Sequence, residues 1–120
     1  MPTLLPARPP LDLFPYPRHP DSRPYGPDLG PGLYVFVQDA AGIVHVLLET
    51  EGHLHPKVLG SAEPAAAAGG LKLGPEGVML EVDNFSGTFQ FGPEIFPQVL
   101  DAILRQGGQI APGCERPFTY

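Results

Sequence analysis

Leu33-Tyr34-Val35-Phe36-Val37-Gln38 and Ile43-Val44-His45-Val46-Leu47-Leu48-Glu49 are the two stretches that decide the fold. Both are rich in β-branched and aromatic residues, which suit the pleated, half-buried surface of a sheet. Between them, Asp39-Ala40-Ala41-Gly42 has the composition of a turn. The sequence therefore predicts a β-hairpin over residues 33–49, at the start of the folded domain.

A second hairpin is predicted further along the chain. Residues 71–73 alternate apolar and polar side chains, and residues 78–83 form the next apolar run. Gly74-Pro75-Glu76-Gly77 between them is a strong turn sequence. A short strand is also predicted over residues 53–59, before this hairpin. Pro56 places that strand at an edge or a bulge, because proline has no amide hydrogen to give to a ladder.

Three shorter segments lie outside these hairpins. Residues 88–91 resume the strand alternation, and residues 117–120 predict a final edge strand. In residues 60–70, the four alanines between Pro64 and Gly69 are too short a run to nucleate a helix. Their small side chains are expected to let the backbone pass close to another element.

One amphipathic helix is predicted near the C-terminus. Gly92-Pro93-Glu94 opens it, since proline suits a first turn and a carboxylate suits the positive end of the helix. Pro97 favours a start near Phe96, and Gly107-Gly108 ends the helix. The apolar side chains that share one face at helical spacing are Ile95, Phe96, Val99, Leu100, Ile103 and Leu104.

These elements define the expected fold class and domain organisation. We expect an α+β fold: an antiparallel sheet of about five to seven short strands, one C-terminal amphipathic helix and an extended proline-rich N-terminal arm. The arm comprises residues 1–31, and a single β-rich domain comprises residues 32–120. A chain of 120 residues fits one domain of this size.

The N-terminal arm holds ten of the seventeen prolines, and its arginines and aspartates balance. Proline fixes φ and removes donors, so an extended or polyproline conformation is expected. The arm also carries apolar groups, among them Phe14, Tyr16 and Tyr25. It either packs across its own sheet or docks into a groove on a partner protein. Both interpretations stay open, and the three aromatic residues are candidate binding residues.

Composition narrows the classes of partner. The net charge is −6 and no basic stripe is present, which disfavours nucleic acid and anionic membrane surfaces. A basic protein partner suits this charge better. Cys114 is the single cysteine, which rules out an intrachain disulfide and a cysteine-based zinc cluster. No run of about 20 apolar residues and no signal-like N-terminus is seen, so a cytoplasmic location is expected.

His53 and His55 are the first candidate site residues. On a strand, residues i and i+2 point to the same face, so both rings could bind one metal ion or ligand. His45 and the carboxylates of Glu49 or Glu51 could add to such a site. One of the imidazoles could also act as a general acid or base. The simpler interpretation is a pair of solvated histidines near a turn.

Asn84 and Ser86 are the second candidate pair, beside Asp83 and Gly87 at an interruption between strands. They either bind a substrate or cap turns through bonds to nearby backbone. The chain contains no nucleophile elbow, phosphate-binding loop, zinc-protease motif or dinucleotide fingerprint. We therefore assign no catalytic residue, no metal ligand and no cofactor.

The order of features over residues 33–106 resembles a domain of plant IQ-motif calmodulin-binding proteins and of the C-termini of bacterial polymorphic toxins. In that family a strand pair leads to H-S-S-F-L, a glycine, A-A-G, a glycine turn and N-x-S-G-H-Y before a helix. The residues of this chain that fit the pattern are His55, Leu59, Ala67, Ala68, Gly69, Asn84, Ser86, Gly87, Phe89, Pro93 and Glu94.

The chain also departs from that pattern. Pro56-Lys57 stands where the family has two serines, Thr88 stands for the histidine, and Phe89 stands for the tyrosine. The hydroxyl and imidazole groups that could do chemistry are thus mostly replaced. The resemblance implies a bacterial toxin, effector or accessory setting without assigning an activity.

Three hypotheses for function follow. The first is a non-catalytic protein-binding or accessory module, which contacts its partner through a sheet face, an edge strand or the arm. The second is a small effector-type enzyme or metal-binding domain built on His53, His55, Asn84 and Ser86. The third is a subunit that forms homo-oligomers through an edge strand. We favour the first hypothesis.

Overall fold

The predicted hairpin over residues 33–49 forms the middle of the structure. Strands β2 (Gly32–Gln38) and β3 (Val44–Leu48) pair antiparallel with Phe36 opposite Val46, which confirms the prediction. This computed structural model describes residue 4 and residues 18–49, 58–59, 64–86 and 89–119.

A second antiparallel hairpin extends the sheet, as predicted. Its strands β4 (Ala67–Leu73) and β5 (Val78–Asp83) are joined through the short 3₁₀ helix η2 (Pro75–Gly77). Strand β4 begins earlier than the sequence suggested and includes the small residues from Ala67 to Gly70. A Cβ on Gly69 would collide with the backbone carbonyl of Asp83, so the expected close approach of the backbone is present.

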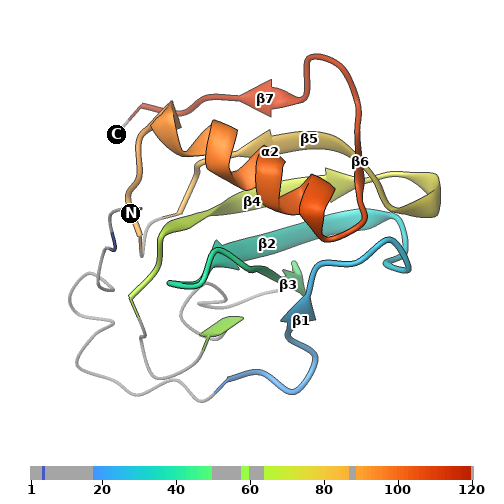
Figure 1. The fold of residues 1–120 in the computed structure, drawn as a ribbon, viewed down its shortest axis with the longest axis horizontal. Helices are drawn as coiled ribbons and strands as arrows, with labels where there is room; N and C mark the ends of the chain where they lie inside the picture. The colour runs from blue at the N-terminus through green and yellow to red at the C-terminus, as the bar shows by residue number, and fades with distance from the viewer. Residues whose placement is uncertain (1–3, 5–17, 50–57, 60–63, 87–88, 120) are drawn as a thin grey trace.

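The remaining strands are two residues long and complete the edges of the sheet. They are β1 (Arg23–Pro24), β6 (Gln109–Ile110) and β7 (Glu115–Arg116). The strand order is β1-β3-β2-β4-β5-β6, with β7 also pairing with β5 (Figure 1). Because β6 and β7 run parallel to β5, the sheet is mixed, and the prediction of a purely antiparallel sheet is wrong.

Two predicted strands are not found among the described residues, and a third lies mostly outside them. Residues 117–119 form no strand, because the chain pairs with β5 just before them, at β7. Residues 89–91 are irregular, although Phe89 and Phe91 are both buried. Of the strand predicted over residues 53–59, only Val58 and Leu59 are described, and these two are helical.

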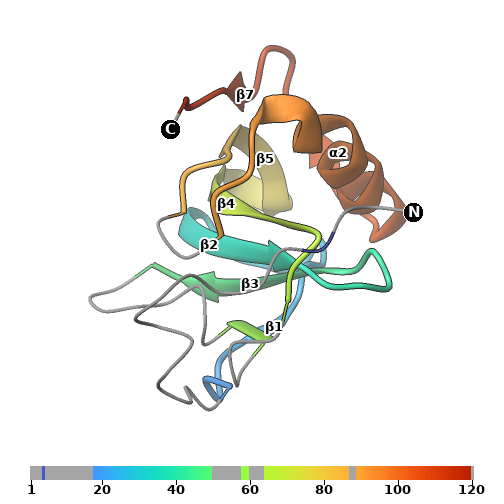
Figure 2. The same ribbon diagram turned by 90° about the vertical axis from the view of Figure 1, so that its left-hand side faces the viewer.

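The C-terminal helix agrees with its prediction in its bounds, whereas Leu104, predicted as part of its apolar face, is exposed. A 3₁₀ turn, η3 (Pro93–Ile95), leads into α2 (Phe96–Arg105), whose first turn contains Pro97. The helix lies to one side of the curled sheet (Figure 2). The amide of Gln98 donates to Gln38 on β2 at 2.7 Å, so a polar contact between helix and sheet accompanies the apolar packing. None of the helices among the described residues has the length and apolar character to cross a membrane.

The second half of the predicted arm is part of the fold. Strand β1 pairs with β3, and Tyr25 is buried with its hydroxyl donating to the carbonyl of Gly77 at 2.6 Å. We call residues 18–29 the strap. The first half of the arm, residues 5–17, lies outside the described residues. The core that the strap helps to close contains Tyr25, Leu29, Val35, Phe36, Val37, Val44, Val46, Leu47, Leu71, Leu73, Met79, Val82, Phe89, Phe91, Phe96, Val99 and Ile103.

Candidate functional site

A shallow groove lies on the sheet face that points away from α2. Leu33 on β2 is opposite Lys72 on β4, and Lys72 is opposite Glu81 on β5. Successive side chains of a strand point to opposite faces, so Leu33 lies on the face opposite to Gln38, which contacts α2. We call this the sheet groove; the residues that line it are Leu33, Tyr34, Glu49, Gly70, Leu71, Lys72, Glu81 and Asp83.

The sheet groove carries an excess of negative charge. Three carboxylates, those of Glu49, Glu81 and Asp83, line it with one ammonium group, that of Lys72. Glu81 is also 3.9 Å from the guanidinium of Arg116, which lies just outside the groove. A positively charged group entering the groove would meet more attraction than repulsion.

Asp83 has a fixed position in the groove. Its Oδ1 accepts the backbone N–H of Gly70 at 2.8 Å and that of Phe85 at 2.9 Å. Gly70 has no side chain, and a Cβ there would lie 3.1 Å from Asp83 Oδ2. The small residue therefore lets the carboxylate of β5 reach across to the backbone of β4, where it lines the groove.

An exposed leucine lies between these charges. Leu33 is 54% exposed although it belongs to β2, which has a strand on each side. The groove has a volume of about 80 Å³. Pockets for drug-sized ligands have volumes of roughly 300–1,000 Å³. The groove therefore suits a few side chains of a partner protein better than it suits a whole small-molecule substrate.

The sequence pointed to Asn84 and Ser86, and the structure gives both a role in holding the backbone. Asn84 is fully buried, and its amide donates to the carbonyls of Phe91 at 2.7 Å and Phe118 at 2.8 Å. Ser86 is also fully buried, and its hydroxyl oxygen accepts the N–H of Phe89 at 3.2 Å. The contact of Ser86 agrees with the turn-capping interpretation, whereas Asn84 holds backbone that lies 7 and 34 residues further along the chain.

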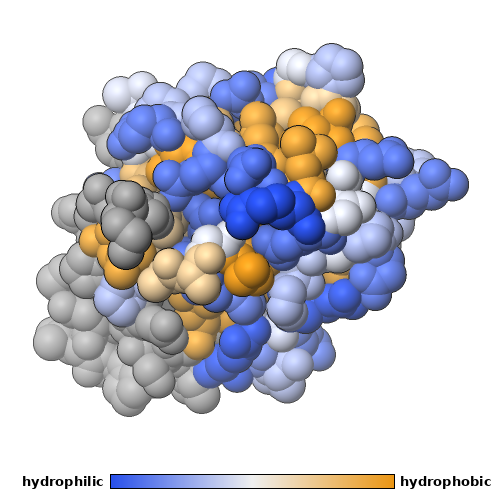
Figure 3. Space-filling view, viewed as in Figure 1, coloured by the Kyte–Doolittle hydropathy of each residue, from blue (hydrophilic) through white to orange (hydrophobic). Residues whose placement is uncertain are grey.

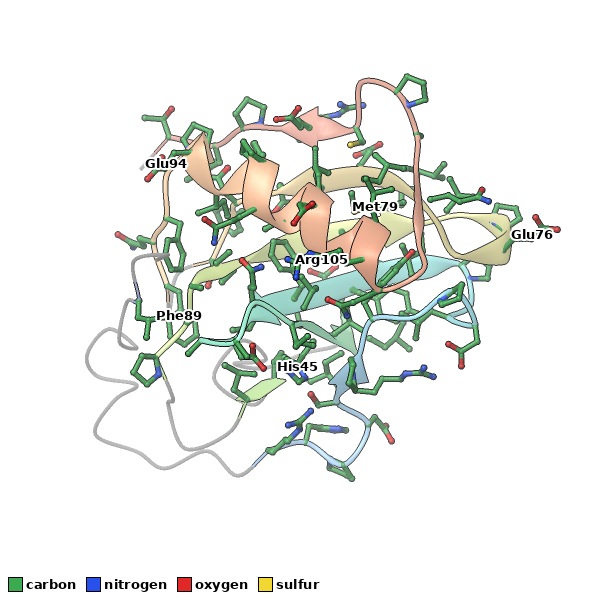
Figure 4. The ribbon with its side chains drawn as sticks, viewed as in Figure 1. His45, Glu76, Met79, Phe89, Glu94 and Arg105 are labelled. Atoms are coloured by element: carbon green, nitrogen blue, oxygen red, sulfur yellow. The ribbon has the colours of Figure 1, made fainter. Side chains whose placement is uncertain are left out.

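His45 is buried and lies between two charged residues. Its Nε2 is 2.8 Å from Asp39 Oδ2, and its Nδ1 is 3.1 Å from the guanidinium of Arg18. Figure 4 shows His45 close to β1, with Glu76 at the tip of the β4–β5 turn. Burial raises the pKa of Asp39, but hydrogen bonds from His45 and from the N–H groups of Ile43 and Ala41 outweigh it and leave the pKa lowered. Asp39 is therefore an anion.

Of the other predicted site residues, only Tyr25 is described by the structure. Phe14, Tyr16, His53 and His55 fall outside the described residues. Tyr25 is a core residue, and burial raises the pKa of its hydroxyl.

A reactive cysteine and a metal centre are two further kinds of site that could carry chemistry. Burial raises the pKa of Cys114, which lowers its thiolate fraction. Within the described part of the chain, no three His, Cys, Asp or Glu side chains lie together as a metal site.

Sequence reasoning missed the sheet groove. Lys72 between Leu71 and Leu73, and Glu81 between Leu80 and Val82, are charged residues inside apolar runs. That alternation shows that one face of each strand meets solvent. Which strands lie side by side, and hence which charges meet, depends on the register of the complete sheet.

The family resemblance of residues 33–106 stays a prediction. No family model, curated protein or solved structure matches the chain.

Proposed function

We propose that this chain is a non-catalytic protein-binding module that contacts its partner through the sheet groove. The observation that carries the proposal is the exposed Leu33 in a central strand, with the carboxylates of Glu49, Glu81 and Asp83 lining the same groove. An apolar group bordered by charges is a usual composition for the centre and rim of a binding surface.

The groove is built on rigid elements. Leu33 and Lys72 are on β2 and β4, which pair with each other over seven residue pairs. The backbone of paired strands has little freedom left to lose on binding, so the main entropic cost is that of ordering the exposed side chains.

The partner we propose presents an apolar side chain beside lysine or arginine. The net charge of −6 would attract such a surface over a distance, and the acidic groove would orient it. The proposed setting is the cytoplasm, where the single buried Cys114 stays a thiol. A second copy of this chain is the alternative partner, and sizing in solution distinguishes it.

The test compares two exposed leucines. Leu33→Glu places a carboxylate in the groove, and Leu104→Glu makes the same change on α2, where Leu104 is 56% exposed. Figure 3 shows the side of the molecule that carries α2, where apolar surface is also visible. Proteins captured from a native extract by the unmodified chain are compared with those captured by each variant.

A supporting result has three parts. A stoichiometric partner binds the unmodified chain and Leu104→Glu, Leu33→Glu weakens its binding about tenfold or more, and higher salt weakens the remaining binding. A partner that Leu33→Glu retains at full affinity would rule out the sheet groove as its contact.

A further inference from the structure

The contacts of His45 determine its protonation state. The Arg18 guanidinium has only donors, so His45 Nδ1, at 3.1 Å, must accept and carries no proton. Nε2 then carries the proton and donates it to Asp39 Oδ2 at 2.8 Å. The two contacts together are compatible only with a neutral ring in this one tautomer.

The two partners of His45 differ in how firmly they are held. Asp39 lies in the β2–β3 turn, where its Oδ1 also accepts the N–H groups of Ala41 and Ile43 at 3.0 and 2.9 Å. Arg18 is exposed at the start of the strap. If the ring changed its charge, Arg18 would be the partner free to move.

We propose that Arg18 and His45 form a pH-dependent latch for the start of the strap. Protonation of His45 places an N–H where the guanidinium donates, and it brings two cations within 3.1 Å of each other. Arg18 then leaves, while the ion pair between His45 and Asp39 becomes stronger. The latch therefore opens when the His45 ring takes up a second proton. This inference does not depend on the sheet groove.

The described charged groups around the latch are few. Asp39 faces His45 from the β2–β3 turn, and Arg18 faces it from the strap. His19 is also in the strap, but its Nδ1 accepts the N–H of Asp21 at 3.0 Å. His19 is therefore a second histidine whose protonation would break a contact within the strap, and the test has to separate the two.

The strap has further attachments that limit the opening. Ser22 donates to the carbonyl of Val58 at 2.6 Å, and Tyr25 is held in the core by Gly77. The release therefore concerns the residues up to Ser22 and leaves β1 paired.

The test is ¹⁵N relaxation of the full chain at about pH 7.5 and about pH 5.5, on either side of the histidine range. We expect the order parameters of Arg18, His19 and Asp21, which unlike Pro20 carry a backbone N–H, to fall from the rigid range, about 0.85, to below about 0.6 at the lower pH. Those of β2 and β3 should not change. The midpoint should coincide with the pH-dependent change in the NMR signals of the His45 ring.

Three variants separate the latch from other causes. His45→Gln should abolish the pH dependence, whereas the matched His19→Gln should keep it. Arg18→Met, which needs no change in the sheet, should leave the strap loose at both pH values. The latch is overturned if residues 18–21 stay equally rigid at both pH values, if His19→Gln removes the effect, or if Arg18→Met preserves it.

Discussion

The side chain of Asn84 holds the backbone of Phe118 at both of its polar groups. Asn84 Oδ1 accepts the N–H of Phe118 at 2.6 Å, and Asn84 Nδ2 donates to the Phe118 carbonyl at 2.8 Å. The same Nδ2 donates to the carbonyl of Phe91 at 2.7 Å. One fully buried side chain thus joins the end of β5, the segment before α2 and the C-terminal tail.

Asn84→Asp is expected to destabilise the fold by about 2–4 kcal/mol, since buried groups lose hydrogen bonds worth roughly 1–3 kcal/mol each. The carboxylate could still accept from Phe118 N–H, but its oxygen would face the carbonyls of Phe91 and Phe118. Urea unfolding measures the change. Gln109→Ala, at an exposed position of β6, is the control and should cost less than about 0.5 kcal/mol. Equal stability of the two variants would contradict the role of Asn84.

Gly69→Ala tests the close approach of β4 to the end of β5. The added Cβ would collide with the Asp83 carbonyl and lie 2.9 Å from the ring of Phe36, so one strand would have to move. We expect a loss of about 3 kcal/mol or more, because overpacking a buried site costs at least 1–3 kcal/mol.

Gly30→Ala is the matched control for Gly69→Ala in thermal unfolding. No atom lies within 4 Å of the Cβ position at Gly30, so we expect this change to be neutral or slightly stabilising. A Gly69→Ala variant as stable as Gly30→Ala would show that the strands separate easily.

Asp39→Asn should make the free energy of unfolding depend less on pH in the acid range. The pKa of Asp39 is lowered in the folded state, so its carboxylate stabilises the fold above its ordinary value of 3.8. This contribution is lost as the pH falls below 3.8 through the lower pKa of the folded state. We expect the variant to lose about 1–2 kcal/mol at neutral pH and less once the pH is below 3.8, where the carboxylate of the unmodified chain becomes protonated. Urea unfolding from about pH 7 to about pH 2 measures it, and parallel curves would contradict the prediction.

Tyr25→Phe should loosen the strap and change the alkaline limit of stability. It removes the bond to the Gly77 carbonyl, at a cost of about 1–2 kcal/mol. Because burial raises the pKa of Tyr25, its contribution is complete below the ordinary value of 10.0 and is lost as the pH rises through the folded-state pKa. Thermal unfolding across about pH 8–11 should show that the melting temperature of the unmodified chain falls more steeply with rising pH than that of Tyr25→Phe. The control is Tyr34→Phe, which removes an exposed hydrogen bond to the carbonyl of Gly30.

The central hairpins and α2 could be predicted because their signals are local. Apolar runs around Asp39-Ala40-Ala41-Gly42 and around residues 74–77 define two antiparallel pairs. Pro93 and Pro97 mark the start of the helix, and Gly107-Gly108 marks its end. In each case the decisive residues are neighbours in sequence.

The edges and the groove could not be predicted in this way. Strands β6 and β7 have two residues each, too few for a periodic pattern, and they pair with a strand about 30 residues earlier in the chain. Phe89 and Phe91 alternate like a strand, but they are buried without one. Leu33, Lys72 and Glu81 meet only because the full register brings them together.

The late pairing of β6 and β7 with β5 has a consequence for how the chain folds during synthesis. Strands β2 to β5 leave the ribosome well before β6, β7 and Phe118, which cover the outer edge of β5 and hold its end. In that interval β5 is paired with β4 on its inner side only, and the backbone groups on its outer edge could pair with another molecule. Chains that stop before residue 109 should therefore aggregate, even though they contain nearly all of the central sheet.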